Sequence, residues 1–220
     1  MLIDIVPDSR VLVFGRQAID WISGAGGLVA MAQEAGGLVE AVTFSRPVVK
    51  DLCKLHTNTL IAYGILGVRS SESWALEEID THLEIGVYRE CIRIIRAFRP
   101  WIILTHGDHE QAVDLLTISR LVELARITAG QPVYPQLGKP WSTGLVLHYE
   151  TELPIPKPHI VVDITSVMAT KRKAMLRLTN RRQKMYQRAL GLSKLRGGMI
   201  GCANGEAYRI SDCQPYQPDI

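Results

Sequence analysis

The sequence predicts a single α/β domain over residues 1–220, built on an open, mostly parallel sheet with helices on both faces. Short β-branched runs alternate with longer stretches in which apolar residues recur at helical spacing, and this alternation is typical of parallel sheets. The 220 residues suffice for one buried core, and a content of 47% hydrophobic and 21% charged residues is ordinary for a globular protein.

Each element of the first half ends at residues that suit its boundary. The expected elements are a strand at 11–15, a helix at 24–35, a strand at 38–44 and a helix at 50–66. Both strands are short apolar runs of the kind found in buried parallel strands. The helices stop at Gly36-Gly37 and at Gly67, because glycine readily adopts the left-handed conformation that ends many helices.

The second half repeats the pattern and predicts where a ligand binds. The expected elements are a helix at 79–98, a strand at 101–105, a helix at 114–129, and strands at 145–149 and 159–164. Pro100 and Gly130 end the two helices. The order predicts a Rossmann-like sheet, in which ligands bind beyond the carboxyl ends of the strands. Residues 15–20 and 106–110 follow two such ends, so we expect them to face one crevice.

Charge is distributed unevenly along the chain. Residues 171–196 hold ten basic residues and no acidic one, which leaves 15 basic against 22 acidic residues elsewhere, a net charge of −7. The basic residues are Lys171, Arg172, Lys173, Arg177, Arg181, Arg182, Lys184, Arg188, Lys194 and Arg196. The pattern favours a long amphipathic helix with a solvated basic face. Nucleic acid is not expected, because no aromatic residues are interleaved for base stacking, and an acidic partner such as segment 77–90 of another copy stays open.

The sequence predicts no membrane partner and a cytoplasmic location. No apolar run approaches the roughly 20 residues that a membrane span requires. The first ten residues lack the basic start and apolar core of a secretory signal. The four cysteines contain no C-x-x-C pair, so they are more typical of free thiols than of a disulfide framework.

Five short segments carry a family resemblance. They are G-A-G-G at 24–27 after the first strand, I-L-G-V at 65–68, R-P at 99–100 leading to T-H at 105–106, V-D-I-T at 162–165, and G-E-A-Y at 205–208. In this order and spacing they resemble the LmbE/PIG-L family of zinc-dependent N-deacetylases. The resemblance covers nearly the whole chain. It implies an LmbE-like fold and an assembly of several subunits, since members of the family commonly associate.

The same resemblance shows that the catalytic motifs are not intact. In the family, the first strand leads into A-H-P-D-D, which supplies a zinc-ligand His, a general-base Asp and a zinc-ligand Asp. Residues 16–20 here read R-Q-A-I-D, so Gln17 stands at the ligand His, Ile19 at the base, and only Asp20 is kept. With T-H held in register and no gap, the later H-P-D-H motif falls on A-V-D-L at 112–115; with a gap it matches H-G-D-H at 106–109.

These replacements argue against the inherited chemistry. A catalytic zinc needs about three protein ligands and an open position for water. Asp20 alone does not hold the ion, the amide of Gln17 is a poor substitute for an imidazole, and Ile19 takes no proton from water. Losing a general base alone typically costs ~10²–10⁴ in rate. We therefore expect no resident metal and no cofactor.

The polar residues after the second crevice strand leave two enzymatic alternatives open. His106, Asp108 and His109 lie close together, with Asp20 expected across the crevice. A remodelled zinc site is one alternative, and metal-free acid/base catalysis by His106 or His109 is the other. The non-catalytic interpretation is a polar loop in which Asp108 caps the next helix.

Arg16 adds a cation to the loop in which the family binds zinc. We expect it to pair with Asp20, whose charge would otherwise lack a counter-charge, although binding of an anionic ligand is also open. The candidate ligand-binding residues are Arg16, Gln17, Asp20, His106, Asp108 and His109, and the candidate catalytic residues are His106, His109 and Asp20. The preferred function is a catalytically degenerate LmbE-like protein that binds a small ligand or serves as a subunit, as a homo-oligomer or beside an active homologue.

Overall fold

The structure is a computed structural model that describes residues 8–45, 52–76, 85–180 and 183–212. Its strands are β1 (Arg10–Gly15), β2 (Leu38–Ser45), β3 (Val68–Leu76), β4 (Ile102–Thr105), β5 (Leu145–Tyr149), β6 (Ile160–Asp163) and β7 (Gly205–Ile210). Its helices are α1 (Ala18–Glu34), α2 (Leu52–Ile65), α3 (Ile85–Phe98), α4 (Val113–Ala129), α5 (Met168–Leu178) and α6 (Lys184–Ile200), with a 3₁₀ turn at Pro135–Leu137.

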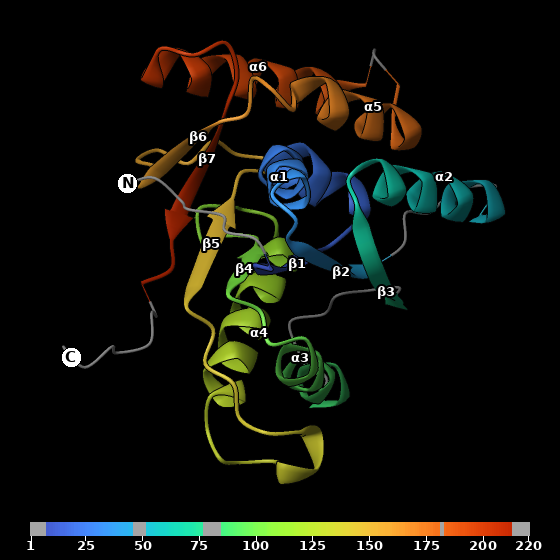
Figure 1. The fold of residues 1–220 in the computed structure, drawn as a ribbon, viewed down its shortest axis with the longest axis vertical. Coiled ribbons are helices and arrows are strands. Elements are labelled where there is room, and N and C mark those ends of the chain that lie inside the picture. The colour runs from blue at the N-terminus through green and yellow to red at the C-terminus, as the bar shows by residue number, and fades with distance from the viewer. Residues whose placement is uncertain (1–7, 46–51, 77–84, 181–182, 213–220) are drawn as a thin grey trace.

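The strands of this part of the chain form one sheet in the order β3-β2-β1-β4-β5-β7-β6 (Figure 1). The first five are parallel to their neighbours, whereas β7 is antiparallel to both β5 and β6. The expected mostly parallel α/β sheet is therefore confirmed. The strand order reverses between β1 and β4, the place where open sheets of this type bind ligands.

Helices cover both faces of the sheet. One core holds Val11, Val13 and Leu104 of the sheet with α1, α2 and residues of α5 and α6. The other core, on the opposite face, holds Leu12, Phe14 and Ile103 with α3 and α4. Figure 1 shows α5 and α6 lying over α1, as an outer layer farther from the sheet. No helix among the described residues is long and apolar enough to cross a membrane.

Helix α1 begins six residues earlier than the sequence predicted. The backbone N–H of Gln17 donates to the carboxylate of Asp20 at 3.0 Å, and this cap starts the helix at Ala18. The G-A-G-G segment therefore lies inside the helix, where it permits close packing. A Cβ atom on Gly24 would lie 2.1 Å from the carbonyl oxygen of Glu150. The predicted end is confirmed, because Gly36 adopts a φ of 83°.

The structure differs from the sequence prediction in three further elements. Strands β3 and β7 were not predicted, since β3 is a polar edge strand with exposed serines and β7 is a late antiparallel addition. The basic segment forms two helices and not one, because the backbone adopts an extended conformation at Thr179 before α6 begins. Parts of the expected helices at 50–66 and 79–98, and Arg181 and Arg182, lie outside the described residues. Cys53 is exposed and Cys91 buried, both as free thiols.

Two cations of the basic segment lie buried in ion pairs that join the outer layer to the sheet. The Nζ of Lys171 lies 2.7 Å from Oε1 of Glu206, and both side chains are almost fully buried. The same carboxylate accepts the backbone N–H groups of Gly27 and Leu28, at 2.7 and 2.8 Å, and the hydroxyl of Tyr208. Arg196 pairs in the same way with Glu150.

Candidate functional site

The predicted crevice lies where β1 and β4 end. These strands are parallel neighbours, and the chain leaves them at Gly15 and Thr105. The backbone N–H of Arg16 donates to Nε2 of His106 at 3.0 Å, so the two loops meet directly. The prediction that residues 15–20 and 106–110 face one crevice is therefore confirmed for Arg16 and His106.

The guanidinium of Arg16 is surrounded by three carboxylates. Its Nε lies 3.1 Å from Asp20, its Nη1 2.9 Å from Asp114 and its Nη2 3.2 Å from Glu152. Burial by itself lowers the pKa of Arg16, but the neighbouring charges and hydrogen bonds of Asp20 and Asp114 outweigh it, and the net pKa is raised. Arg16 is thus a permanent cation, and the expected pair with Asp20 is confirmed.

Asp20 is fully buried and depends on its partners for charge balance. Burial raises the pKa of this carboxyl, while the charge of Arg16 and the backbone N–H of Gln17 oppose that rise. One carboxylate therefore has two roles, because it caps the first turn of α1 and holds Arg16 across the loop. Neither oxygen is left without a donor.

His106 is a packed structural residue in this geometry. Its Nε2 accepts the backbone N–H of Arg16, so the ring proton lies on Nδ1, which donates to Oγ1 of Thr151 at 3.0 Å. The ring is fully buried, and burial, followed by the charge of Arg16, holds its pKa well below the ordinary value. A neutral imidazole with both nitrogens engaged has no free atom for a metal or a substrate proton.

Asp108, His109 and Glu110 contact other parts of the fold. Asp108 is exposed and pairs with Arg209 at 3.2 Å, and the residue that caps α4 is Ala112, so the expected cap at Asp108 is wrong. Glu110 is buried and accepts the backbone N–H groups of residues 151–153, which fixes the loop after β5. The side chain of His109 is buried beside Glu110, 3.6 Å away.

His109 is the least satisfied of the predicted site residues. Neither ring nitrogen has a hydrogen-bond partner among the described residues. Burial, followed by the charge of His148, lowers its pKa to about 4, so the ring is neutral at physiological pH. The charges that act on His109 are those of His148, Asp108 and Arg209, and a charge on His109 in turn lowers the pKa of His106.

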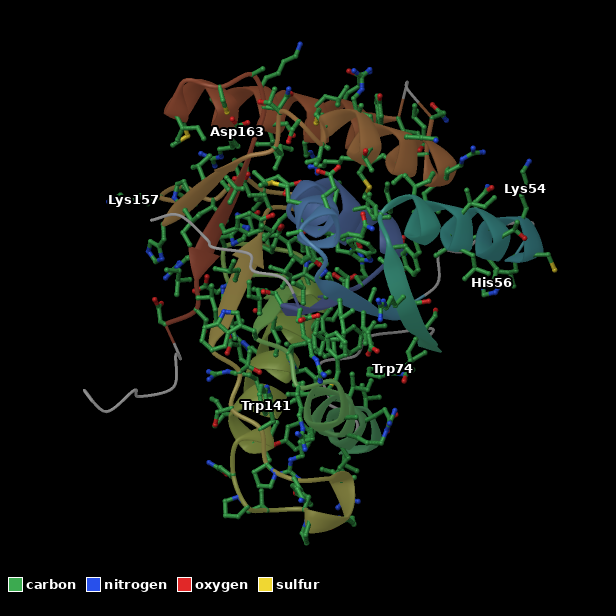
Figure 2. The ribbon with its side chains drawn as sticks, in the orientation of Figure 1. Lys54, His56, Trp74, Trp141, Lys157 and Asp163 are labelled. Carbon is green, nitrogen blue, oxygen red and sulfur yellow. The ribbon has the colours of Figure 1, made fainter. Side chains whose placement is uncertain are left out.

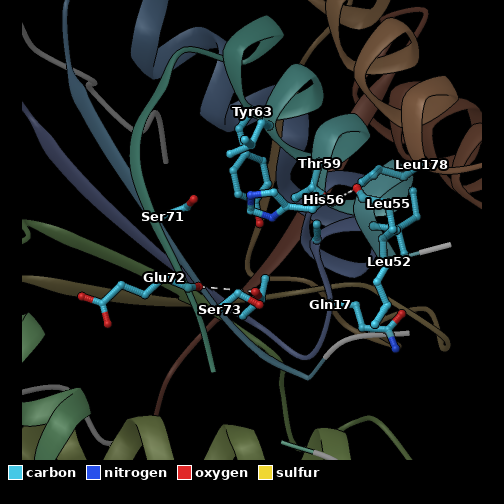
Figure 3. Close-up of a pocket in the computed structure, with 14 residues that line it drawn as sticks. Gln17, Leu52, Leu55, His56, Thr59, Tyr63, Ser71, Glu72, Ser73 and Leu178 are labelled. Carbon is cyan, nitrogen blue, oxygen red and sulfur yellow. Dashed lines mark hydrogen bonds between the residues drawn. The ribbon is translucent and has the colours of Figure 1, made fainter. Parts of the chain in front are cut away.

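A pocket of about 230 Å³ opens beside the Arg16 loop (Figure 3). Its walls come from the start of α1, from β2, from α2, from β3 and from the end of α5. Apolar lining residues are Ala18, Ile19, Leu52, Leu55, Leu60 and Leu178, and polar ones are Gln17, Thr43, His56, Thr59, Tyr63, Ser71, Glu72 and Ser73. His56 and Lys54 both lie on α2, near the edge of the molecule (Figure 2). His56 lines the pocket, whereas Lys54 does not.

The predicted ligand-binding residues therefore separate into two groups. Arg16, Gln17, Asp20 and His106 come together at the crevice, and Gln17 also lines the pocket. Asp108 and His109 belong to the loop beyond them. The sequence did not single out Glu152, and Asp114 was noted only as part of the family frame. The sequence did hold one signal for Asp114. When the family's H-P-D-H motif is aligned without a gap, it falls on A-V-D-L at 112–115, which contains Asp114.

The residues at the crevice do not fit a zinc ion. Asp20 and Asp114 are both engaged by a guanidinium, and both nitrogens of His106 are hydrogen bonded. Among the residues the structure describes, no group of three His, Cys, Asp or Glu side chains is placed to hold a metal. A catalytic zinc requires about three such ligands, and the engaged side chains of the crevice do not supply them.

Comparisons with known proteins bear on the fold. No family model matches the sequence. The structure is similar to a conserved protein of Thermus thermophilus, with a TM-score of 0.84 and 20% identity over 94% of this chain and 97% of that one. It is also similar to the N,N'-diacetylchitobiose deacetylase of Pyrococcus horikoshii, with a TM-score of 0.79 and 18% identity over 95% and 88% of the two chains.

A third similar structure is the 4-carboxy-2-hydroxymuconate hydratase of Pseudomonas putida, with a TM-score of 0.79 and 20% identity over 96% and 99% of the two chains. The chain has the fold of these proteins. The predicted LmbE-like α/β fold is thus confirmed. Deacetylases and a hydratase share this fold, so the fold by itself does not determine the reaction.

Proposed function

We propose that this protein is a metal-independent relative of the LmbE-type deacetylases that binds a small neutral ligand in the pocket beside Gln17. In this proposal the inherited hydrolysis is lost, and the protein acts as a binding protein or as a subunit beside an active homologue. The observation that carries the proposal is the position of Arg16, whose guanidinium neutralises the carboxylates that would otherwise attract a metal ion.

Electrostatics makes a metal and Arg16 mutually exclusive. A divalent ion about 4 Å from the guanidinium would be repelled by roughly 8 kcal/mol at an effective dielectric constant of about 20. Asp20 and Asp114 would also have to leave their present partner. The cation thus stabilises the loop in the way a bound ion would, without offering a Lewis acid.

The proton acceptor is missing as well. Ile19 stands where the family resemblance implies the general base, and its side chain contributes to the apolar lining of the pocket. His106 is held neutral and fully engaged, so it does not replace that base. Both halves of the ancestral mechanism, activation of water and removal of its proton, therefore lack a residue.

The lining of the pocket supports a neutral ligand with one apolar side. None of the lining residues is Lys or Arg. The only carboxylate of the lining, that of Glu72, is turned to Nε1 of Trp74 and to Arg93, at 3.1 and 3.2 Å. Leucines from α2 and α5 form one wall, while the hydroxyls of Ser71 and Ser73 on β3 lie on the opposite one (Figure 3). An N-acylated sugar or a similar polyhydroxylated amide matches this division.

Metal content tests the first half of the proposal. We expect protein purified without chelator to contain far less than one zinc per chain by elemental analysis. The double variant Arg16→Ala, Gln17→His, which removes the cation, frees Asp20 and Asp114 and adds one imidazole, should bind more zinc than the wild type. One zinc per wild-type chain, lost on His106→Ala or His109→Ala, would overturn the proposal in favour of a hydrolase with a remodelled site.

A matched pair of variants tests the second half. Thr59 lines the pocket, whereas Thr57 on the same helix is exposed and outside it; each hydroxyl donates to the carbonyl four residues earlier. We expect N-acetylglucosamine, used as a probe in calorimetry, to bind the wild type and Thr57→Trp equally, and Thr59→Trp at least tenfold more weakly. Equal affinity for all three proteins would exclude this pocket, whatever the metal assay shows.

A further inference from the structure

Helices α5 and α6 present an outer surface of uncompensated positive charge. Six cations of these helices are exposed, and none of them has a carboxylate partner among the described residues: Arg172, Lys173, Arg177, Lys184, Arg188 and Lys194. No acidic residue occurs between Asp163, at the end of β6 (Figure 2), and Glu206. The two other described cations of the segment, Lys171 and Arg196, are buried in the ion pairs with Glu206 and Glu150.

Apolar side chains share this surface. The buried residues of α6 are Tyr186, Ala189, Ser193, Arg196 and Gly197, and they define its inner side. At 100° per residue, Lys184, Arg188, Lys194, Leu195 and Met199 fall on the opposite side. Leu195 and Met199 are 56% and 52% exposed, so two large apolar groups stand among the cations and are open to solvent.

We propose that the outer face of α5 and α6 is a docking surface for an anionic lipid membrane. Cations that meet phosphate groups and apolar side chains that enter the headgroup boundary are the two contributions by which surface helices bind anionic bilayers. The two helices form the outermost layer over α1, on the side away from the sheet, so both reach a surface together (Figure 1). This proposal is independent of the pocket and of the metal question.

The same residues fit a nucleic acid less well. Single strands are held by bases stacked on aromatic rings, but the only aromatic residue of the two helices is Tyr186, which is buried. Exposed Leu195 and Met199 add nothing to a phosphate contact, whereas they lower the free energy of a lipid interface. The basic pattern alone favoured a solvated face and no membrane partner; the shared position of the apolar residues is what changes that expectation.

Vesicle co-sedimentation tests the proposal. We expect the full chain to bind vesicles of phosphatidylcholine with about 30% phosphatidylserine, to bind pure phosphatidylcholine weakly, and to be released at about 0.5 M salt. The variant Lys184→Gln, Arg188→Gln, Lys194→Gln should partition roughly 100-fold more weakly, at about fivefold per cation. The control Arg69→Gln, Arg120→Gln, Lys139→Gln removes the same charge elsewhere and should bind within about threefold of the wild type.

The apolar contribution is tested separately. Leu195→Gln with Met199→Gln keeps every charge, and we expect it to lower binding about tenfold or more. Equal binding to neutral and anionic vesicles, or equal losses in the two charge variants, would overturn the proposal. So would tight binding of duplex DNA without vesicle binding, or an oligomer that dissociates in the Leu195→Gln, Met199→Gln protein, since the face would then be a protein interface.

Discussion

Replacing Arg16 tests the ion pairs that its guanidinium makes with Asp20, Asp114 and Glu152. The change Arg16→Ala leaves Asp20 fully buried with the backbone N–H of Gln17 as its remaining donor. Breaking a buried ion pair typically costs about 3–5 kcal/mol in free energy of unfolding. We expect about 3 kcal/mol near neutral pH, because the other two partners, Asp114 and Glu152, are 33% and 39% exposed and contribute little.

The loss should depend on pH in a defined direction. Burial raises the pKa of Asp20 in the wild type, and Arg16 limits that rise, so the variant has a still higher pKa. A carboxyl with a raised folded-state pKa stabilises the fold at low pH and loses that contribution as the pH rises. The difference in stability between wild type and variant should therefore be small near pH 4 and grow toward pH 7.

Urea unfolding of both proteins at several pH values measures this difference. The double variant Arg16→Ala, Asp20→Asn removes the buried charge together with its partner, so we expect it to recover most of the stability at neutral pH. A loss that is the same at every pH, or a double variant no more stable than Arg16→Ala, would refute the ion-pair reasoning.

Three further predictions concern stability. Gly24→Ala should destabilise the protein by more than about 2 kcal/mol in urea unfolding, because the new Cβ would overlap the carbonyl of the chain after β5; the control Gly64→Ala, with open space around the Cβ on an exposed helix, should stabilise by up to about 1 kcal/mol. Lys171→Met should cost about 3–5 kcal/mol, and adding Glu206→Gln should restore part of it; a non-recovering double variant would contradict the buried pair. His109, with a folded pKa of about 4, should make stability fall as the pH drops below about 6.5, by at most about 1.4 kcal/mol per unit, and His109→Gln should flatten that slope in calorimetric melts.

The parallel core of the fold could be predicted because its local signals agree. The runs that became β1, β4 and β5 are apolar and lie between helices, so burial on both faces dictates both composition and structure. The polar edge strand β3 escaped prediction, since only one side of it packs and its serines are typical of a loop. The break at Thr179 was missed because the prediction of one long helix was based on the run of basic residues and not on helix propensity.

The site was predictable only in part, for a different physical reason. The pair of Arg16 with Asp20 could be expected from the sequence, because the two residues lie four positions apart and the carboxylate needs a counter-charge. Glu152, in contrast, reaches the same guanidinium across 136 positions of chain. The partners of the two histidines, Thr151 for His106 and Glu110 for His109, come from the fold of the loop after β4, and no residue pattern fixes that loop.

Strand β7 comes last in the sheet by sequence but lies between β5 and β6. During synthesis, the outer edge of β5 has no neighbour until residues 205–210 have left the ribosome. The carboxylate that satisfies the N–H groups of Gly27 and Leu28 arrives at the same moment. Such sequence-distant pairing is slow, so the edge of β5 stays open to other strands until the end of the chain pairs with it.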